Sequence, residues 1–223
     1  MKRLAAILCL LLPSVAMADD IEIHFRDTSG YVTDDVASVN DTYCLEEDSS
    51  VSRGSPAFTF GWTTIGGDAG RDRNTGVDKA LAGVISCSNT TGPCEFFITL
   101  LSTGNKTVCI AAGDYSSDAW QRNHVEIYDD STLEFTADLN GSGGSGGTPA
   151  GSFMDTSSTN RTAAAWRAGQ TCQSVNFAST NFVMKIGGLA LDPDGGNTPI
   201  ASVSVTDEAA SDNLPILQAI GEE

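Results

Sequence analysis

EFFITLLSTGNKTVCIAAGDYSSD, residues 95–118, holds two apolar segments that are separated by a Ser-Thr-Gly turn and followed by a polar loop. Large apolar residues recur at every second position of both segments, which places them on one face of a β-strand. They are Phe96, Ile98 and Leu100 in the first segment and Val108 and Ile110 in the second. The stretch therefore predicts two strands, each with one buried face.

The same alternation recurs elsewhere, in IEIHF (21–25), HVEIYDD (124–130), NFVMKIGG (181–188) and PIASVSV (199–205). The inward residues of the last three segments are Val125, Ile127, Phe182, Met184, Ile186, Ile200, Val203 and Val205. Helical periodicity is weak, and only TAAAWRAG (162–169) and LQAIGEE (217–223) suggest short helices. These six segments, among at least seven short strands that we expect with turn residues between them, predict an all-β fold, a sandwich of two antiparallel sheets.

Residues 1–18, MKRLAAILCLLLPSVAMA, have a basic start, an apolar run and an Ala-Met-Ala end. This is the layout of a bacterial-style secretory signal peptide, so we expect cleavage before Asp19 and a secreted or periplasmic protein. The apolar run is too short for a permanent anchor, and no later stretch approaches the roughly 20 apolar residues of a membrane-spanning helix.

The remaining chain has the length of one large β domain, which we place at residues 19–206. NGSGGSGGTPAGS (140–152) is a Gly/Ser run that predicts a flexible surface loop within it. Residues 207–223 carry five acids and no base, and we interpret them as an acidic tail or as a segment that docks on a partner.

The chain is strongly acidic. Without residues 1–18 it carries 10 Lys and Arg against 29 Asp and Glu, a formal charge of −19. Such a surface repels phosphate backbones and anionic lipid, so a nucleic-acid partner is not expected.

Five cysteines remain after residue 18, and the number is odd. CSNTTGPC, residues 87–94, is a short polar loop that can bring Cys87 and Cys94 within bonding distance, and we predict a disulfide between them. The pairing of Cys44, Cys109 and Cys172 stays open on spacing alone.

The order of these segments resembles the galactose-binding-like jelly-roll modules that accompany bacterial polysaccharide-active enzymes and occur in phage-associated proteins. The stretch at 95–118 and HVEIYDDST carry the central part of the likeness. The flanking segments that extend it are TFGWTTIGGDAGRDRN (59–74), GSFMD (151–155), TAAAWRAG (162–169), NFASTNFVMKIGG (176–188) and IASVSV (200–205). The resemblance implies a non-catalytic jelly-roll sandwich that binds glycans through loops at one end. It also allows a structural calcium ion, whose ligands the sequence does not identify.

Two loop regions have the residue types of a sugar site. Trp62 lies near Arg71, Asp72 and Arg73, and an exposed Trp ring beside charged groups can stack on a sugar while they bind its hydroxyls. The alternative is a buried Trp62 with the charged residues tying the loop together.

The second region is the loop after residue 113, where Tyr115 and Trp120 flank Asp114. In the structural interpretation, Gly113 lets the backbone leave the strand and Asp114 hydrogen-bonds backbone amides nearby. In the functional one, Asp114 contacts a ligand or cation. His124, Glu126 and Tyr128 share one strand face, which we interpret as solvated sheet surface.

Enzymatic motifs are missing from the sequence. Residues 143–147 match G-x-S-x-G, but they lie in the Gly/Ser run without the flanking strand and helix of a nucleophile elbow. DPDGGN (192–197) lacks the Gly and the acid of an EF-hand at the required positions and is a typical turn. We therefore expect no enzyme and no organic cofactor.

Two functions fit these observations. The first is a secreted module that binds carbohydrate or a cell-surface polymer. The second is a structural protein of the cell surface or an extracellular appendage, which would self-associate; the odd cysteine and the acidic tail favour it.

Overall fold

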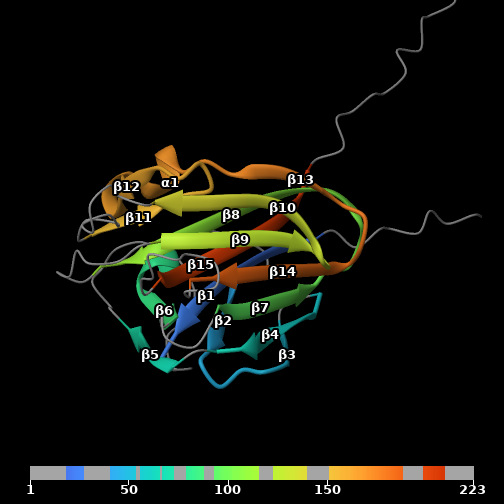
Figure 1. Cartoon of the computed structure of the whole chain (residues 1–223), viewed down its shortest axis with the longest axis horizontal. Coiled ribbons are helices and arrows are strands. Elements are labelled where there is room, and N and C mark those ends of the chain that lie inside the picture. Colours follow the sequence, from blue (N-terminus) through green and yellow to red (C-terminus); the bar gives the residue numbers. More distant parts are fainter. Residues whose placement is uncertain are drawn as a thin grey trace, which may run out of the picture.

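The computed structural model describes residues 19–27, 41–53, 56–65, 67–72, 79–87, 93–115, 123–139, 151–187 and 198–208. Strands dominate these residues and form two mostly antiparallel sheets that pack face to face (Figure 1). The predicted all-β sandwich is therefore confirmed.

The larger sheet has nine strands within the described residues, with β12-β11-β8-β15-β1-β2 as its main path. Its long strands β8 and β15 pair along seven residue pairs, and β13 and β11 share the other edge of β8. The members are β1 (Asp20–Arg26), β2 (Asp41–Leu45), β5 (Gly67–Asp72), β6 (Gly83–Cys87), β8 (Gly104–Asp114), β11 (Ser152–Met154), β12 (Asn160–Thr162), β13 (Gln173–Phe177) and β15 (Thr198–Asp207).

The smaller sheet, counted over the same part of the chain, has six strands in the order β10-β9-β14-β7-β4-β3. Its centre is built from the segments whose alternation is clearest in the sequence. The members are β3 (Val51–Arg53), β4 (Phe58–Thr64), β7 (Cys94–Thr99), β9 (Asn123–Asp129), β10 (Thr132–Leu139) and β14 (Asn181–Ile186).

One strand pair departs from the antiparallel prediction: β1 and β2 are parallel. A parallel pair cannot be joined by a tight turn, because the chain must cross back to the start of the first strand. Residues 27–40 provide the length for that connection.

The core lies between the two sheets. All the residues predicted to point inward are buried, from Phe96 in β7 to Val205 in β15. Aromatic rings fill its centre, where Phe96 contacts Phe25 edge-on at 5.0 Å between ring centroids. Alternation along each strand was sufficient to identify this face, because successive side chains of a strand point to opposite sides.

A second, smaller cluster covers part of the other face of the nine-stranded sheet. Phe153 of β11 and Trp166 pack there with ring centroids 5.9 Å apart. Trp166 begins the four-residue helix α1 (Trp166–Gly169), which follows the 3₁₀ turn η2 (Ala163–Ala165); another 3₁₀ turn, η1 (Lys79–Leu81), adds Leu81 to the cluster. The predicted helical character of residues 162–169 is confirmed in this short form.

Two disulfides connect described residues. Cys87 and Cys94 join β6 to β7 with their Cα atoms 5.8 Å apart, as predicted. Cys109 of β8 and Cys172 are also bonded, a pair that spacing did not identify. Cys44 is a buried free thiol. Disulfides are typical of proteins that fold outside the cytosol.

Several predicted features lie outside the described residues. They are residues 1–18, most of the Gly/Ser run at 140–150, the turn at 192–197 and the acidic tail from residue 209 onward.

Candidate functional site

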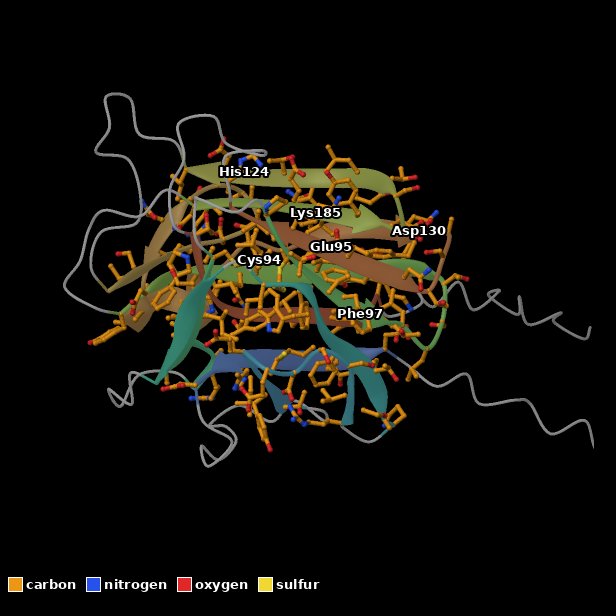
Figure 2. All side chains as sticks on the ribbon, turned by 60° about the horizontal axis from the view of Figure 1, so that its bottom comes forward. Cys94, Glu95, Phe97, His124, Asp130 and Lys185 are labelled. Carbon is orange, nitrogen blue, oxygen red and sulfur yellow. A yellow bond between two sulfur atoms is a disulfide. The ribbon has the colours of Figure 1, made fainter. Side chains whose placement is uncertain are left out.

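The outer surface of the six-stranded sheet carries a set of partly exposed side chains from β7, β14 and β9. These three strands are neighbours, and each alternates buried residues with residues of intermediate exposure. Figure 2 shows Glu95, Phe97 and Lys185 on this part of the sheet. We call this surface the outer face; its central residues are Glu95, Phe97, Glu126, Tyr128, Val183 and Lys185.

The strand register places Tyr128, Val183 and Phe97 directly beside one another, one on each strand. We call these three residues the aromatic row, after the two rings that flank Val183. Leu133 of β10 lies opposite Tyr128 and extends the row toward the sheet edge. Leu133 is 49% exposed, and no other large hydrophobic residue among the described ones is classed as exposed. The outer face thus has a continuous apolar stripe across four strands.

At the other end, the stripe meets Gly61 of β4, which pairs with Phe97. A Cβ atom at Gly61 would lie 2.7 Å from the carbonyl oxygen of Asp48, so the turn at Asp48 and Ser49 covers this position closely. Asp48 is held by Arg53, whose Nη1 is 2.7 Å from Oδ2. The turn at Asp48 and Ser49 therefore closes the apolar stripe at the β4 end.

A row of charged residues runs parallel to the aromatic row. Glu126, Lys185 and Glu95 are direct neighbours on β9, β14 and β7, and we call them the charged row. The Nζ atom of Lys185 is 3.7 Å from Oε2 of Glu95 and 4.7 Å from the centroid of the Tyr128 ring. Lys185 thus contacts Glu95 in its own row and Tyr128 in the aromatic row.

Tyr128 links the rows through its hydroxyl group, which donates a hydrogen bond of 2.5 Å to Oε2 of Glu126. This bond, together with burial and the negative charge of Glu126, raises the pKa of Tyr128 to about 12. The phenol therefore stays protonated at physiological pH and its ring stays neutral.

His124 begins the polar part of this surface on β9. Its Nε2 is 3.2 Å from Oε1 of Glu126, and its Nδ1 is 3.6 Å from Oδ2 of Asp138 on β10. His124 is only 8% exposed. The interpretation of this strand face as solvated sheet surface is therefore wrong at His124, which is buried and lies beside Asp138 of the edge strand β10.

Trp62 lies in the core. It is 3% exposed, and its ring is 5.2 Å from that of Phe25 and 5.1 Å from that of Phe96. Of the two interpretations of Trp62, the structure shows the buried one, since its strand turns this residue toward the opposite sheet. Its ring is not available as a surface platform.

The charged residues near Trp62 in sequence are only partly described. Arg71 and Asp72 lie in β5, opposite Val84 and Gly83 of β6. Arg73 and Trp120 lie outside the described residues. Their role in ligand binding stays a prediction.

Gly113 and Asp114 are the last two residues of β8, so the strand does not end at the glycine. A Cβ atom at Gly113 would lie 2.5 Å from the backbone oxygen of Ser152. Only a glycine at this position of β8 therefore lets β11 approach so closely. Asp114 is 4% exposed, and Tyr115 packs against the cluster of Phe153. These positions favour the structural interpretation.

Cys44 is fully buried, and burial, assisted by the charge of Asp48, raises the pKa of its thiol. A protonated, inaccessible thiol is a poor nucleophile. We therefore expect the native chain from Asp19 onward not to react with an aromatic disulfide reagent, and to release one equivalent of chromophore once it is unfolded without reductant. Rapid release from the native protein would contradict this burial.

Among the described residues, no group of three or more His, Cys, Asp or Glu side chains could hold a metal ion. Over the same residues, no helix has the length and apolarity to cross a bilayer.

The chain was compared with protein family models, with curated proteins and with solved structures, and none of the three comparisons gave a significant match.

The aromatic row was missed in the sequence, although its members are visible there. Phe97 alternates with Phe96 and Ile98 and must therefore point away from the core. Its neighbours Val183 and Tyr128 come from segments 86 and 31 residues further along the chain. Only the order of the strands reveals that the three side chains form one surface.

Proposed function

We propose that the chain is a secreted, non-catalytic module that binds carbohydrate on the outer face. The observation that carries this proposal is the aromatic row beside the charged row. Aromatic and aliphatic side chains stack on the apolar C–H faces of sugar rings. Charged groups next to them form strong hydrogen bonds with hydroxyl groups.

The geometry favours a chain of sugars over a single one. Tyr128 and Phe97 are separated by the strand that carries Val183, so they lie about 10 Å apart, two interstrand spacings. A ligand that touches both rings must extend across three strands. The turn at Asp48 and Ser49 limits how far it reaches beyond Phe97.

Charge favours a neutral glycan. Glu95 and Glu126 flank Lys185 on the outer face, and the whole chain has a formal charge of −17. An anionic polysaccharide would be repelled by this surface. We therefore expect neutral oligosaccharides to bind in preference to uronate or sulfated ones.

The test is glycan-array binding of the chain from Asp19 onward, in calcium and in chelator, with Phe97→Ala and Tyr115→Ala as paired variants. Loss of the Phe97 ring should weaken binding about tenfold, since an aromatic stacking contact contributes about 1–1.5 kcal/mol. Tyr115→Ala removes an aromatic residue from the other predicted region and should leave the affinity unchanged. Trp62 is not a suitable probe, because its substitution disturbs the core.

Three outcomes are distinct. Loss of binding in the Phe97 variant alone supports the outer face. Loss in the Tyr115 variant alone would move the site to the loop after β8, as the resemblance implies. Absence of binding to any glycan under both conditions would refute carbohydrate recognition.

The second proposed function is assembly of a larger structure, and one observation favours it. Among the strands of the described residues, β10 is the last on one side of its sheet, is eight residues long and carries the exposed Leu133. An edge strand of this length can pair with another chain. The odd cysteine does not support assembly, because Cys44 is buried.

Light scattering separates the two functions. An assembling chain should form larger species that Leu133→Lys abolishes, since a charge on an edge strand opposes pairing. A single monomeric species that Leu133→Lys leaves unchanged would count against assembly.

A further inference from the structure

The start of β1 and the end of β15 meet at a buried cluster of charges. The side chains of Asp19 and Lys106 are 0% and 1% exposed, and that of Asp207 is 31% exposed. The Nζ atom of Lys106 is 2.6 Å from Oδ2 of Asp19 and also contacts Oδ1 of Asp207. One ammonium group therefore lies between two carboxylates.

Both oxygens of the Asp19 carboxylate accept hydrogen bonds. Its Oδ1 accepts a hydrogen bond of 2.6 Å from the backbone N–H of Leu101. Its Oδ2 accepts bonds from the backbone N–H and the hydroxyl group of Ser102, at 3.1 Å and 3.0 Å. Residue 19 is thus fixed in position by the turn that follows β7.

The backbone of Asp19 faces Asp207. The nitrogen of Asp19 donates a hydrogen bond of 2.9 Å to Oδ2 of Asp207. In return, the nitrogen of Asp207 donates one of 2.6 Å to the carbonyl oxygen of Asp19. The atom that would become a free amine after cleavage before Asp19 therefore already contacts a carboxylate.

Cleavage before Asp19 would balance the charges of these three side chains. While the chain continues upstream, the nitrogen of Asp19 is a neutral amide, and the cluster holds two negative charges and the single positive charge of Lys106. A free α-amine carries a proton below its ordinary pKa of about 7.7–8.0. It would add the second positive charge beside Asp207, whose side chain is only partly buried.

We propose that the Ala18–Asp19 bond is a processing site and that the new α-ammonium group of Asp19 forms an ion pair with Asp207, which neutralises the buried cluster. Cleavage is a hydrolysis by a signal-peptidase type of enzyme: the C–N bond breaks, water supplies a hydroxyl group to the Ala18 carbonyl carbon, and protons go to the nitrogen. Before this step the nitrogen of Asp19 already lies 2.9 Å from Oδ2 of Asp207, where the new amine would form the ion pair. The inference depends on the predicted signal peptide and not on carbohydrate binding.

Lys106 responds to the same surroundings. Burial alone would lower its pKa, but hydrogen bonds and charge from Asp19 and Asp207 outweigh burial and raise it. The lysine is therefore cationic at neutral pH and does not itself supply the missing second charge.

The test compares two proteins, one that begins at Asp19 with a free amine and one that begins at Met17 and retains Ala18. At pH 6.5 the urea midpoint of the first should be higher by roughly 0.5 M, because its hydrogen bond to Asp207 gains a charge. Asp207 favours the charged amine, so the folded-state pKa exceeds the unfolded one. The gain is then complete below about pH 7.7 and is lost as the pH rises through the folded value. At pH 10.5 the difference should be smaller or absent.

Matched variants locate the effect. Asp207→Asn should abolish the difference between the two proteins, while Asp130→Asn, a change on the exposed turn after β9, should preserve it. The intact mass of protein exported from the full-length chain should correspond to residues 19–223. A different cleavage position, or equal midpoints of the two proteins at pH 6.5, would overturn the proposal.

Discussion

Replacing both Cys109 and Cys172 with Ala is expected to lower the free energy of unfolding by about 4 kcal/mol. The bond closes a loop of 63 residues, and cross-linking a loop of that length removes much of the conformational entropy of the unfolded chain. It also fixes the segment before β13 to the middle of β8. Denaturant unfolding of the chain from Asp19 onward, monitored by circular dichroism, measures the change.

The other disulfide is the matched control. Cys87 and Cys94 are only seven residues apart, so removal of that bond should lower the stability by about 2.5 kcal/mol in the same chain-entropy account. Removal of the Cys109–Cys172 bond should therefore lower the stability more than removal of the Cys87–Cys94 bond. If the short loop proved the more important of the two, loop closure would not be the main contribution of these bonds.

Asp155→Asn is expected to lower the free energy of unfolding by about 2–3 kcal/mol, because it removes the charge of a buried carboxylate that accepts several hydrogen bonds and pairs with the partly exposed Arg161. Asp155 is fully buried, and its Oδ2 is 2.5 Å from Nε of Arg161 and 2.9 Å from the backbone nitrogen of Thr171. Its Oδ1 accepts hydrogen bonds from the backbone and the hydroxyl group of Ser157. Both oxygens face donors, so the amide group of Asn would meet a donor in either orientation.

The effect of this substitution should depend on pH. Burial alone would raise the pKa of Asp155, but its hydrogen bonds with Ser157, Arg161 and Thr171 outweigh burial and lower it. A carboxylate with a lowered pKa contributes stability above its unfolded value, about 3.9, and loses that contribution as the pH falls through the folded value. The stability difference between wild type and Asp155→Asn should therefore be full at pH 6 and shrink toward pH 2.

Asp130→Asn provides the comparison, because Asp130 is exposed in the turn between β9 and β10. This change should alter the stability by less than about 0.5 kcal/mol at either pH. An Asp155 variant that behaves like the Asp130 variant would show that the buried pair contributes no net stability.

Much of the fold could be predicted from the sequence, because the decisive patterns are local. Phe96, Ile98 and Leu100 identify an inward face by alternation alone, and the same rule holds for Val125 and Ile127. The pairing of Cys87 with Cys94 could be predicted because a short loop leaves little freedom of geometry.

The candidate site could not be predicted in the same way. Trp62 is followed in the sequence by charged residues of the kind found at sugar-binding sites. Its position in β4 nevertheless directs its side chain into the core. Alternation alone turns Phe97 away from the core, but only the strand order shows that it lies beside Val183. Residue type identified neither outcome, since aromatic side chains serve both roles.

The sequence by itself determined the strands with the clearest alternation, β1, β7, β8, β9, β14 and β15, and the inward-facing side of most of them, because both properties repeat within a few residues. The tertiary structure decided which strands are neighbours. It alone brings Tyr128 beside Phe97, bonds Cys109 to Cys172, and places Asp19 against Asp207 across 188 residues of chain. Such contacts depend on the order and register of strands throughout the sheet, and no pattern confined to one segment contains that information.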